Sequence, residues 1–257
     1  MKTPKLSPKA LEAAEKSLSL GGKFLYTPRN LYYEMIRREA WAPPDPKSPR
    51  ASIVAFREAV AVHERHHGAL PGLIRAAEAR AAVPPPHLPD VFDYSVRRVL
   101  VFDRVETFLL FAMNGFHRKI EVALVTLGGK AEGTFPEHVA RRLERQLANG
   151  LRTAFYLVHD ASRGGTRLRG RTRKLFGEHG KPRLADVGLS FAQAFRMGVP
   201  VRTGPARARV TTGPMALEDQ LLVAQGNYAH LEELSPLALM RFVYERIARG
   251  PDDLGFG

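Results

Sequence analysis

The chain has 257 residues, no cysteine and a formal charge of +13, from 39 Lys and Arg against 26 Asp and Glu. This length allows one large domain or two small ones. The absence of cysteine excludes disulfides and thiolate metal sites, which leaves carboxylates and histidines as metal ligands. No apolar run is long enough to span a membrane, and the N-terminal region lacks the apolar core of a secretion signal. We therefore expect a globular, cytoplasmic, nucleoid-associated protein.

The first 83 residues favour short helices. An amphipathic pattern over 8–17 stops at Gly21 and Gly22, and Thr27 with Pro28 begins a second helix that extends to Arg38. Two further helical patterns follow: 50–67 and 70–82. Several short helices in such a segment are typical of a winged-helix or helix-turn-helix module. Residues 1–83 are therefore predicted to form a winged-helix-like DNA-binding domain.

A proline-rich segment divides the chain, because residues 84–92 follow the pattern of an extended linker. Beyond it, three apolar runs have the length of buried strands: 98–102, 122–127 and 154–158. Two helical patterns lie between them: 105–116 and 136–147. This alternation predicts an α/β domain with a parallel sheet over residues 93–257, ending in a mostly helical tail.

Two of the predicted strands end in an acid. Asp103 follows the first strand and Asp160 follows the third, while Glu106 lies one helical turn after Asp103. Ligands of open α/β sheets bind at the carboxyl ends of the strands, where such acids converge if their strands are neighbours. Two or three carboxylates suit Mg²⁺ or Mn²⁺ near a phosphate. The alternative is that these acids only cap the helices that follow.

The positive charge is clustered, which the arginine preference of a GC-rich genome does not explain by itself. Arg202, Arg207 and Arg209 form one group, and a denser group occupies a predicted loop after the third strand. Such clusters are the expected footprint of a polyanion such as double-stranded DNA. The denser group supplies the predicted DNA-contacting residues: Arg163, Arg167, Arg169, Arg171, Arg173 and Lys174.

Arg29 lies one helical turn before Tyr33 in the predicted second helix. A phenol with a pKa near 10 is a poor nucleophile unless a cation stabilises its oxyanion, and Arg29 is placed to do so. Tyr33 is therefore a candidate nucleophile for DNA cleavage. The alternative is that Tyr33 and its neighbour Tyr32 belong to the apolar face of a helix.

Two other patterns are less specific. His63 and His67 share one helical face with His66 nearby, but they lack the intervening glutamate of a zinc-protease helix, so they are expected to be surface or phosphate-contacting residues. Residues 128–133 form a glycine-rich segment without Walker spacing. No nucleotide cofactor is expected there.

Three motifs occur together in one order. They are Arg-x-x-Tyr-Tyr from Arg29, Asp-Arg-Val-Glu-Thr-Phe from Asp103, and His-Asp-Ala-Ser-Arg-Gly-Gly from His159. In this order the chain resembles the A subunit of type IIB topoisomerases and the meiotic double-strand-break transesterase, which join a winged-helix domain to a TOPRIM metal domain. The resemblance covers residues 20–250 in outline, and only the tyrosine segment is close.

The resemblance implies a DNA topoisomerase-like transesterase, an isomerase, in which Tyr33 forms a covalent 5′-phosphotyrosyl bond and Arg29 is its basic partner. It implies Mg²⁺ or Mn²⁺ at Asp103, Asp160 and Glu106. It also implies a homodimer, in which the tyrosine of one protomer meets the metal site of the other, and a separate GHKL-type ATPase subunit.

The chain departs from this family at two positions. Ser162 stands in place of the second aspartate of the family's Asp-x-Asp, and Asp103 stands where the family has glutamate. Two alternatives therefore stay open. One is a non-catalytic DNA-binding subunit with a decayed metal site. The other is a hydrolytic TOPRIM nuclease, since the Glu106-Thr107-Phe108 segment also resembles the TOPRIM subunit of the Wadjet plasmid-defence system.

Overall fold

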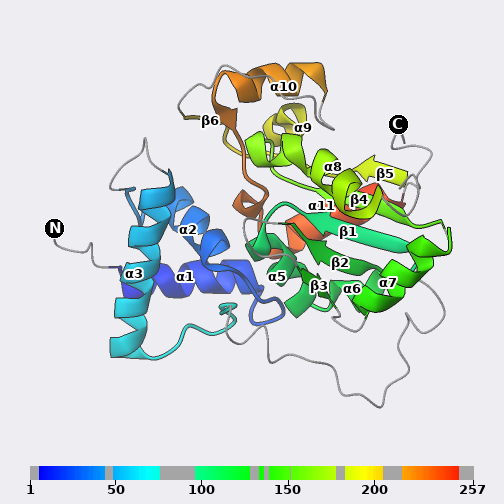
Figure 1. Cartoon of the computed structure of the whole chain (residues 1–257). Helices are drawn as coiled ribbons and strands as arrows, with labels where there is room; N and C mark the ends of the chain where they lie inside the picture. The colour runs from blue at the N-terminus through cyan, green and yellow to red at the C-terminus, as the bar shows by residue number, and fades with distance from the viewer. Residues whose placement is uncertain are drawn as a thin grey trace, which may run out of the picture.

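The computed structural model shows a group of N-terminal helices beside a mixed α/β unit (Figure 1). The α/β class predicted from the sequence is confirmed. Among the described residues, no helix is both long and apolar enough to cross a membrane. The structure describes residues 6–43, 49–75, 96–127, 133–135, 139–150, 152–177, 183–204 and 216–248.

The α/β unit is built on a five-stranded sheet in the order β3-β2-β1-β4-β5. The central strand β1 (Arg98–Phe102) pairs in parallel with β2 (Ala123–Thr126) and with β4 (Ala154–Val158). The strand β5 (Arg183–Asp186) continues the parallel sheet, whereas β3 (Gly133–Phe135) pairs antiparallel with β2. The predicted parallel sheet is thus present, with an antiparallel edge strand that the sequence did not predict.

Side chains alternate across the sheet and contribute to two cores. Leu100 and Phe102 belong to a buried cluster with side chains of α5, α6 and α11, and Val99 and Val101 belong to another with side chains of α7 and α8. Helices therefore cover both faces, which buries the strands on both sides. The bounds are Val105–Met113 for α5, Phe116–Ile120 for α6, Val139–Ala148 for α7, Arg163–Phe176 for α8 and Pro236–Ala248 for α11.

Two sequence predictions in this unit are wrong in part. The helix predicted over 105–116 is broken, because Gly115 has a left-handed φ of 68° that separates α5 from α6. The arginine-rich segment is a helix and not a loop. Ser162 caps its N-terminus, and Leu168, Thr172 and Phe176 form a buried stripe at i, i+4 spacing.

The N-terminal helices have a core of their own. They are α1 (Pro8–Ser19), α2 (Pro28–Arg37) and α3 (Pro49–His67), as the sequence predicted. Thr27 begins α2 through a capping box, in which the Asn30 N–H donates to Thr27 Oγ1 (3.2 Å) and the Thr27 N–H donates to Asn30 Oδ1 (3.0 Å). The winged-helix assignment of this region stays a prediction.

The helix predicted over 70–82 is wrong over its described part. Residues 70–75 are not helical, because this segment runs beside Tyr26. The Tyr26 N–H donates to the Gly72 carbonyl (2.9 Å), and the Ile74 N–H donates to the Tyr26 carbonyl (2.8 Å). Gly72 has a positive φ of 71°, which ends helical geometry there. Residues 76–82, like the predicted linker over 84–92, lie outside the described residues.

The segment before α11 passes beside the carboxyl end of β4. Its Ala229 N–H donates to the Ala161 carbonyl just after β4 (2.9 Å), which holds the two segments together. The predicted helical tail is interrupted by a short strand and a 3₁₀ turn. The elements between β5 and α11 are α9 (Phe191–Arg196), β6 (Arg202–Thr203), α10 (Leu217–Ala224), β7 (Asn227–Tyr228) and the 3₁₀ turn η2 (Leu231–Glu233).

Polar contacts join the two units. The Asn30 side chain of α2 donates to the carbonyls of Glu232 (3.0 Å) and Leu234 (3.1 Å). Asn114 and Leu25 exchange two further hydrogen bonds of 2.9 and 3.0 Å. These contacts place α2 against η2, and so beside the carboxyl ends of β1 and β4.

Candidate functional site: an arginine-lined cleft above a buried acidic cluster

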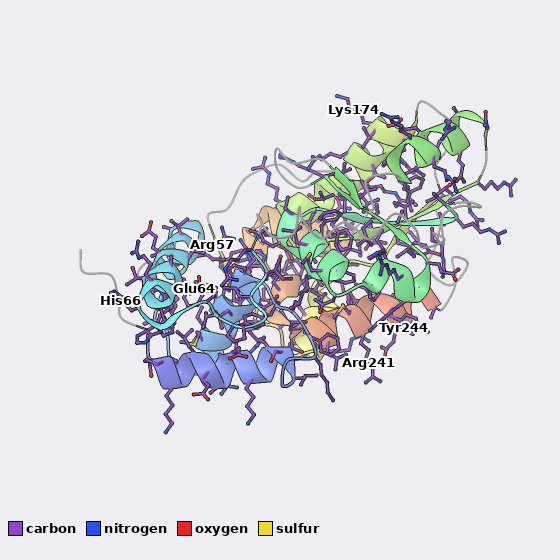
Figure 2. The ribbon with its side chains drawn as sticks, turned by 90° about the horizontal axis from the view of Figure 1, so that it is seen from below. Arg57, Glu64, His66, Lys174, Arg241 and Tyr244 are labelled. Atoms are coloured by element: carbon purple, nitrogen blue, oxygen red, sulfur yellow. The ribbon has the colours of Figure 1, made fainter. Side chains whose placement is uncertain are left out.

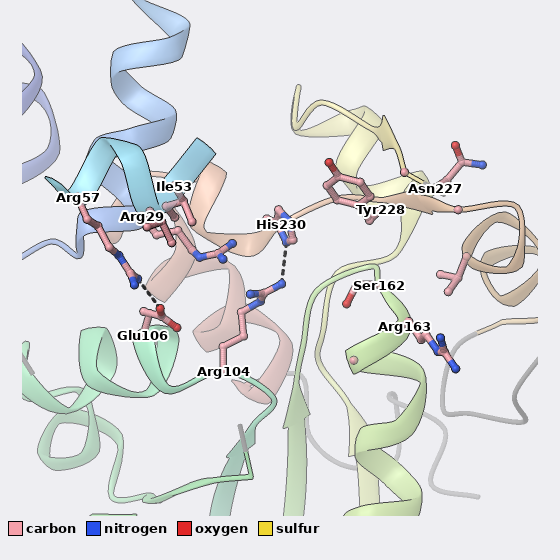
Figure 3. Close-up of a pocket in the computed structure, with 15 residues that line it drawn as sticks. Arg29, Ile53, Arg57, Arg104, Glu106, Ser162, Arg163, Asn227, Tyr228 and His230 are labelled. Carbon is pink, nitrogen blue, oxygen red and sulfur yellow. Dashed lines mark hydrogen bonds and ion pairs between the residues drawn. The ribbon is translucent and has the colours of Figure 1, made fainter. Parts of the chain in front are cut away.

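A cleft of about 690 Å³ lies between the N-terminal helices and the carboxyl ends of the strands. Figure 3 shows its lining residues, which come from α2, α3, the turn after β1, the start of α8 and the segment around β7. The described lining residues include four arginines: Arg29, Arg57, Arg104 and Arg163.

The cleft has an excess of positive charge. Glu106 is the one acid among its described lining residues, and it is paired with Arg57 at 2.7 Å. Ser162, Arg163 and Gly164 bring the N-terminus of α8 to the same cavity. A helix N-terminus with free N–H groups attracts anions, and guanidinium groups bind phosphate with well-defined geometry. The cleft is therefore suited to an oxyanion such as a phosphodiester.

Asp160 lies just after β4 and is fully buried. Its Oδ2 is paired with Arg104 and accepts from His230 Nδ1 at 2.7 Å, while its Oδ1 accepts from the Leu231 N–H at 2.8 Å. Burial opposes the charge of this carboxylate, but Arg104 and His230 outweigh burial and hold the pKa of Asp160 well below its usual range. Asp160 is thus an ionised carboxylate whose oxygens already have partners.

Glu232 completes a group of three possible metal ligands with Asp160 and His230, in which one ligand atom from each lies within 4.8 Å of the others. Its Oε1 accepts from Thr107 Oγ1 at 2.7 Å, whereas its Oε2 is buried with no hydrogen-bond partner. Burial, together with the nearby Asp160, raises the pKa of Glu232. His230 and Glu232 were not predicted from the sequence, in which their only local signal is the His-x-Glu spacing.

The three acids expected to bind Mg²⁺ do not gather into one site. Asp103 is half-buried close to Asp160, and desolvation followed by that neighbouring charge raises the pKa of Asp103. Glu106 is held by Arg57, and Asp160 groups instead with His230 and Glu232. The described residues therefore bring Asp103 and Asp160 together but not Glu106, and a three-carboxylate Mg²⁺ site stays a prediction.

Tyr33 lies beside this cluster in the same chain. Its ring is 5.9 Å from that of His230 between centroids, and the Arg202 guanidinium lies 5.2 Å from its ring centroid. Burial raises the pKa of Tyr33, and Arg29 only partly offsets that effect. The Tyr33 side chain is 4% exposed and does not line the cleft. Arg29 and Arg202 are therefore both basic neighbours of Tyr33, the phenol is shielded from solvent, and its role as a nucleophile stays a prediction.

The predicted DNA-contacting cations lie along α8. Arg163 lines the cleft, and the helix continues away from it. Arg167, Arg173 and Lys174 are exposed, while Arg169 and Arg171 are half-buried. Arg202 is not available in the same way, because it pairs with Glu233. Arg207 and Arg209 lie outside the described residues.

Comparisons of this chain with protein-family models, with curated proteins and with solved structures found no match. The features that bear on function are therefore the cleft, the acidic cluster and the cations of α8.

Proposed function

We propose that this protein binds the phosphodiester backbone of double-stranded DNA, with one phosphate in the arginine-lined cleft and further phosphates along α8. The observation that carries this proposal is the convergence of Arg29 and Arg163 from two distant segments on one cavity at the N-terminus of a helix, beside Arg104, whose guanidinium also pairs with Asp160. Most of the lining charge is positive, and the one acid among the described lining residues is already paired. Such a cavity favours a polyanion over neutral or cationic ligands.

The charge along α8 extends this binding surface. Exposed cations at Arg163, Arg167 and Lys174 are spaced by about one or two helical turns, so they share one side of the helix. Each backbone phosphate that such a side chain neutralises releases counterions, so affinity falls with salt. The strength of binding to DNA is therefore expected to be salt-dependent and largely independent of base sequence.

The test is the affinity of the full chain for a fluorescent DNA duplex, measured by anisotropy at several salt concentrations in EDTA. Arg29→Gln and Arg163→Gln should each weaken binding about tenfold, because each removes one phosphate contact. Arg241→Gln is the matched control, since it removes the same charge from an exposed position of α11 that Figure 2 places far from Lys174. Equal losses in all three variants would show that only net charge matters and would refute a specific cleft.

A second function is favoured by a separate observation. Tyr33 lies next to Arg29 and to the Asp160, His230 and Glu232 group within one chain. In the corresponding transesterase reaction, Tyr33 Oη forms a bond to the scissile phosphorus, the bond from phosphorus to the 3′ oxygen breaks, and the phenol proton ends on that oxygen. The product is a 5′-phosphotyrosyl end. This reaction requires Tyr33 to become accessible, because it is buried in the described conformation.

Covalent trapping separates the two functions. A duplex labelled at both 3′ ends is incubated with the protein and denatured, and transesterification leaves the labelled downstream fragment attached to protein. Tyr33→Phe should remove the adduct and leave duplex affinity unchanged, whereas Tyr32→Phe should keep both. An absence of any adduct with intact binding would leave a DNA-binding protein without this chemistry. The homodimer and the ATPase partner stay predictions, tested by light scattering and by co-purification.

A further inference from the structure

We propose that Asp160, His230 and Glu232 form a binding site for a transition-metal dication of the Zn²⁺ class, which enters in exchange for the guanidinium of Arg104. This site uses a different set of residues from the three carboxylates expected from the sequence. It does not depend on DNA binding. Three features of the described conformation favour it, beginning with a polar atom that is left unsatisfied.

The first feature is the unpartnered oxygen of Glu232. This side chain is fully buried, and its Oε2 has no hydrogen-bond partner, although Oε1 is held by Thr107. Leaving a buried polar atom unpaired is unfavourable, and a carboxylate oxygen without a donor is a natural cation ligand. Thr107 also fixes the carboxylate, so binding a cation would cost Glu232 little further side-chain freedom.

The second feature is a conflict at His230. Its Nδ1 lies 2.7 Å from Asp160 Oδ2, which only accepts, and 3.1 Å from Arg104 Nη2, which only donates. One imidazole nitrogen cannot donate to the carboxylate and accept from the guanidinium at the same time. A metal ion bound by Nδ1 and Oδ2 would remove the conflict.

The third feature is the open cleft beside Arg104, which can accommodate its guanidinium after displacement. The Arg104 side chain is 23% exposed and lines the arginine cleft, as Figure 3 shows. A guanidinium displaced from Asp160 can therefore turn into the cleft without unfolding the site. The exchange replaces one positive charge by two next to the carboxyl groups of Asp160 and Glu232.

The donor set selects the metal. One imidazole nitrogen and two carboxylate oxygens suit Zn²⁺, which accepts four ligands, whereas Mg²⁺ prefers six oxygens and retains water. Ligand atoms around tetrahedral Zn²⁺ are about 3.4 Å apart, so atoms already within 4.8 Å of one another need only a small contraction. The expected order of affinity is Zn²⁺, then Mn²⁺, then Mg²⁺.

The experiment is titration calorimetry of the full chain with ZnCl₂, MnCl₂ and MgCl₂. It uses a His63→Gln, His67→Gln background, because those rings are stacked at 4.5 Å on the surface of α3 and would bind Zn²⁺ themselves. We expect one Zn²⁺ per chain and an affinity at least a hundredfold weaker for Mg²⁺. Arg104→Gln should bind Zn²⁺ at least tenfold more tightly, because the competing cation is gone.

Glu232→Gln should bind Zn²⁺ at least tenfold more weakly while keeping its circular dichroism spectrum. If Glu232→Gln does not fold, Arg104→Gln still decides the matter through its affinity and through a Zn²⁺-dependent rise in melting temperature that exceeds that of the parent. Absence of stoichiometric Zn²⁺ binding, or unchanged affinity in Arg104→Gln, would overturn the proposal. Because duplex affinity is measured in EDTA, neither result affects the DNA-binding proposal.

Discussion

Asp186→Asn tests whether the buried His159 is held as a cation beneath the cleft. His159 Nε2 donates to the Asp186 carboxylate (3.0 Å to Oδ1), and its Nδ1 donates to the Asp160 carbonyl at 2.9 Å. An imidazole that donates from both nitrogens must be protonated. Burial opposes that charge, but the carboxylate of Asp186 outweighs burial and raises the pKa of His159 from 6.5 to about 9.

The pH dependence follows from this rise. A folded-state pKa of about 9 against 6.5 in the unfolded chain corresponds to about 3 kcal/mol of stability at about 1.4 kcal/mol per pH unit. Because the folded pKa is the higher one, the full contribution is present below pH 6.5 and is lost as the pH rises through 9. In the Asp186→Asn variant, a neutral His159 can accept from the new amide, so the cost of the substitution should be about 3 kcal/mol at pH 6 and close to zero at pH 10.

The measurement is urea unfolding of the parent and the variant at pH 6, 8 and 10, followed by circular dichroism. Comparing the two proteins at each pH cancels the titration of all other groups. Glu245→Gln serves as control, because this exposed acid pairs with the exposed Arg241 and its loss should change stability by less than about 1 kcal/mol at every pH. A difference between parent and Asp186→Asn that stays constant with pH would refute a protonated His159.

Three further outcomes are expected. Gly188→Ala should lower the free energy of unfolding by about 1–3 kcal/mol, because its Cβ would lie 2.6 Å from His159 ring atoms. Gly177→Ala should be nearly neutral, because its Cβ would meet nothing within 4 Å. Equal effects of the two substitutions in urea unfolding would contradict the contact. Asn30→Asp should lower the melting temperature sharply, since a carboxylate would then face two carbonyls; an unchanged value in calorimetry would mean that α2 does not depend on this contact. Replacing Arg167 and Lys174 by Gln should reduce the slope of log affinity for duplex against log salt by about two, and an unchanged slope would exclude α8 from the DNA interface.

The parts of the fold that were predictable are those with local causes. The strand at 98–102 is a short apolar run, and α2 has Thr27 and Pro28 at its start, so both were found from the sequence with little error. The edge strand β3 was not found from the sequence. Its three residues are too few to show an alternation of apolar and polar side chains, and it forms only by pairing with β2. The segment that forms α8 was assigned to a loop because its many arginines gave it a polar composition. Its buried residues at i, i+4 spacing were therefore not recognised as one face of a helix.

The candidate site was predictable only in part, because contacts between distant segments leave no local signal in the sequence. Asp103 and Asp160 follow neighbouring strands, which the sequence left as an open condition and the pairing of β1 with β4 supplies. His230 and Glu232 lie at a 3₁₀ turn about seventy residues after Asp160, and their approach depends on how the C-terminal segment returns over the sheet. Arg104 is next to Asp103 in sequence, yet its pairing with Asp160 is a tertiary contact. Residue type alone therefore suggested acids near a phosphate, but not which acids would meet.

The contact between α2 and η2 has a consequence for how the protein is made. Asn30 and its two acceptor carbonyls are separated by 202 and 204 residues, so this contact forms only after nearly the whole chain has been synthesised and its two ends have met. Contacts between residues so far apart in the sequence form late and slowly during folding, because closing a long loop costs chain entropy. Nascent or truncated chains would thus carry the arginines without the cleft. The proposed recognition of DNA phosphates would arise only in molecules that have completed their fold.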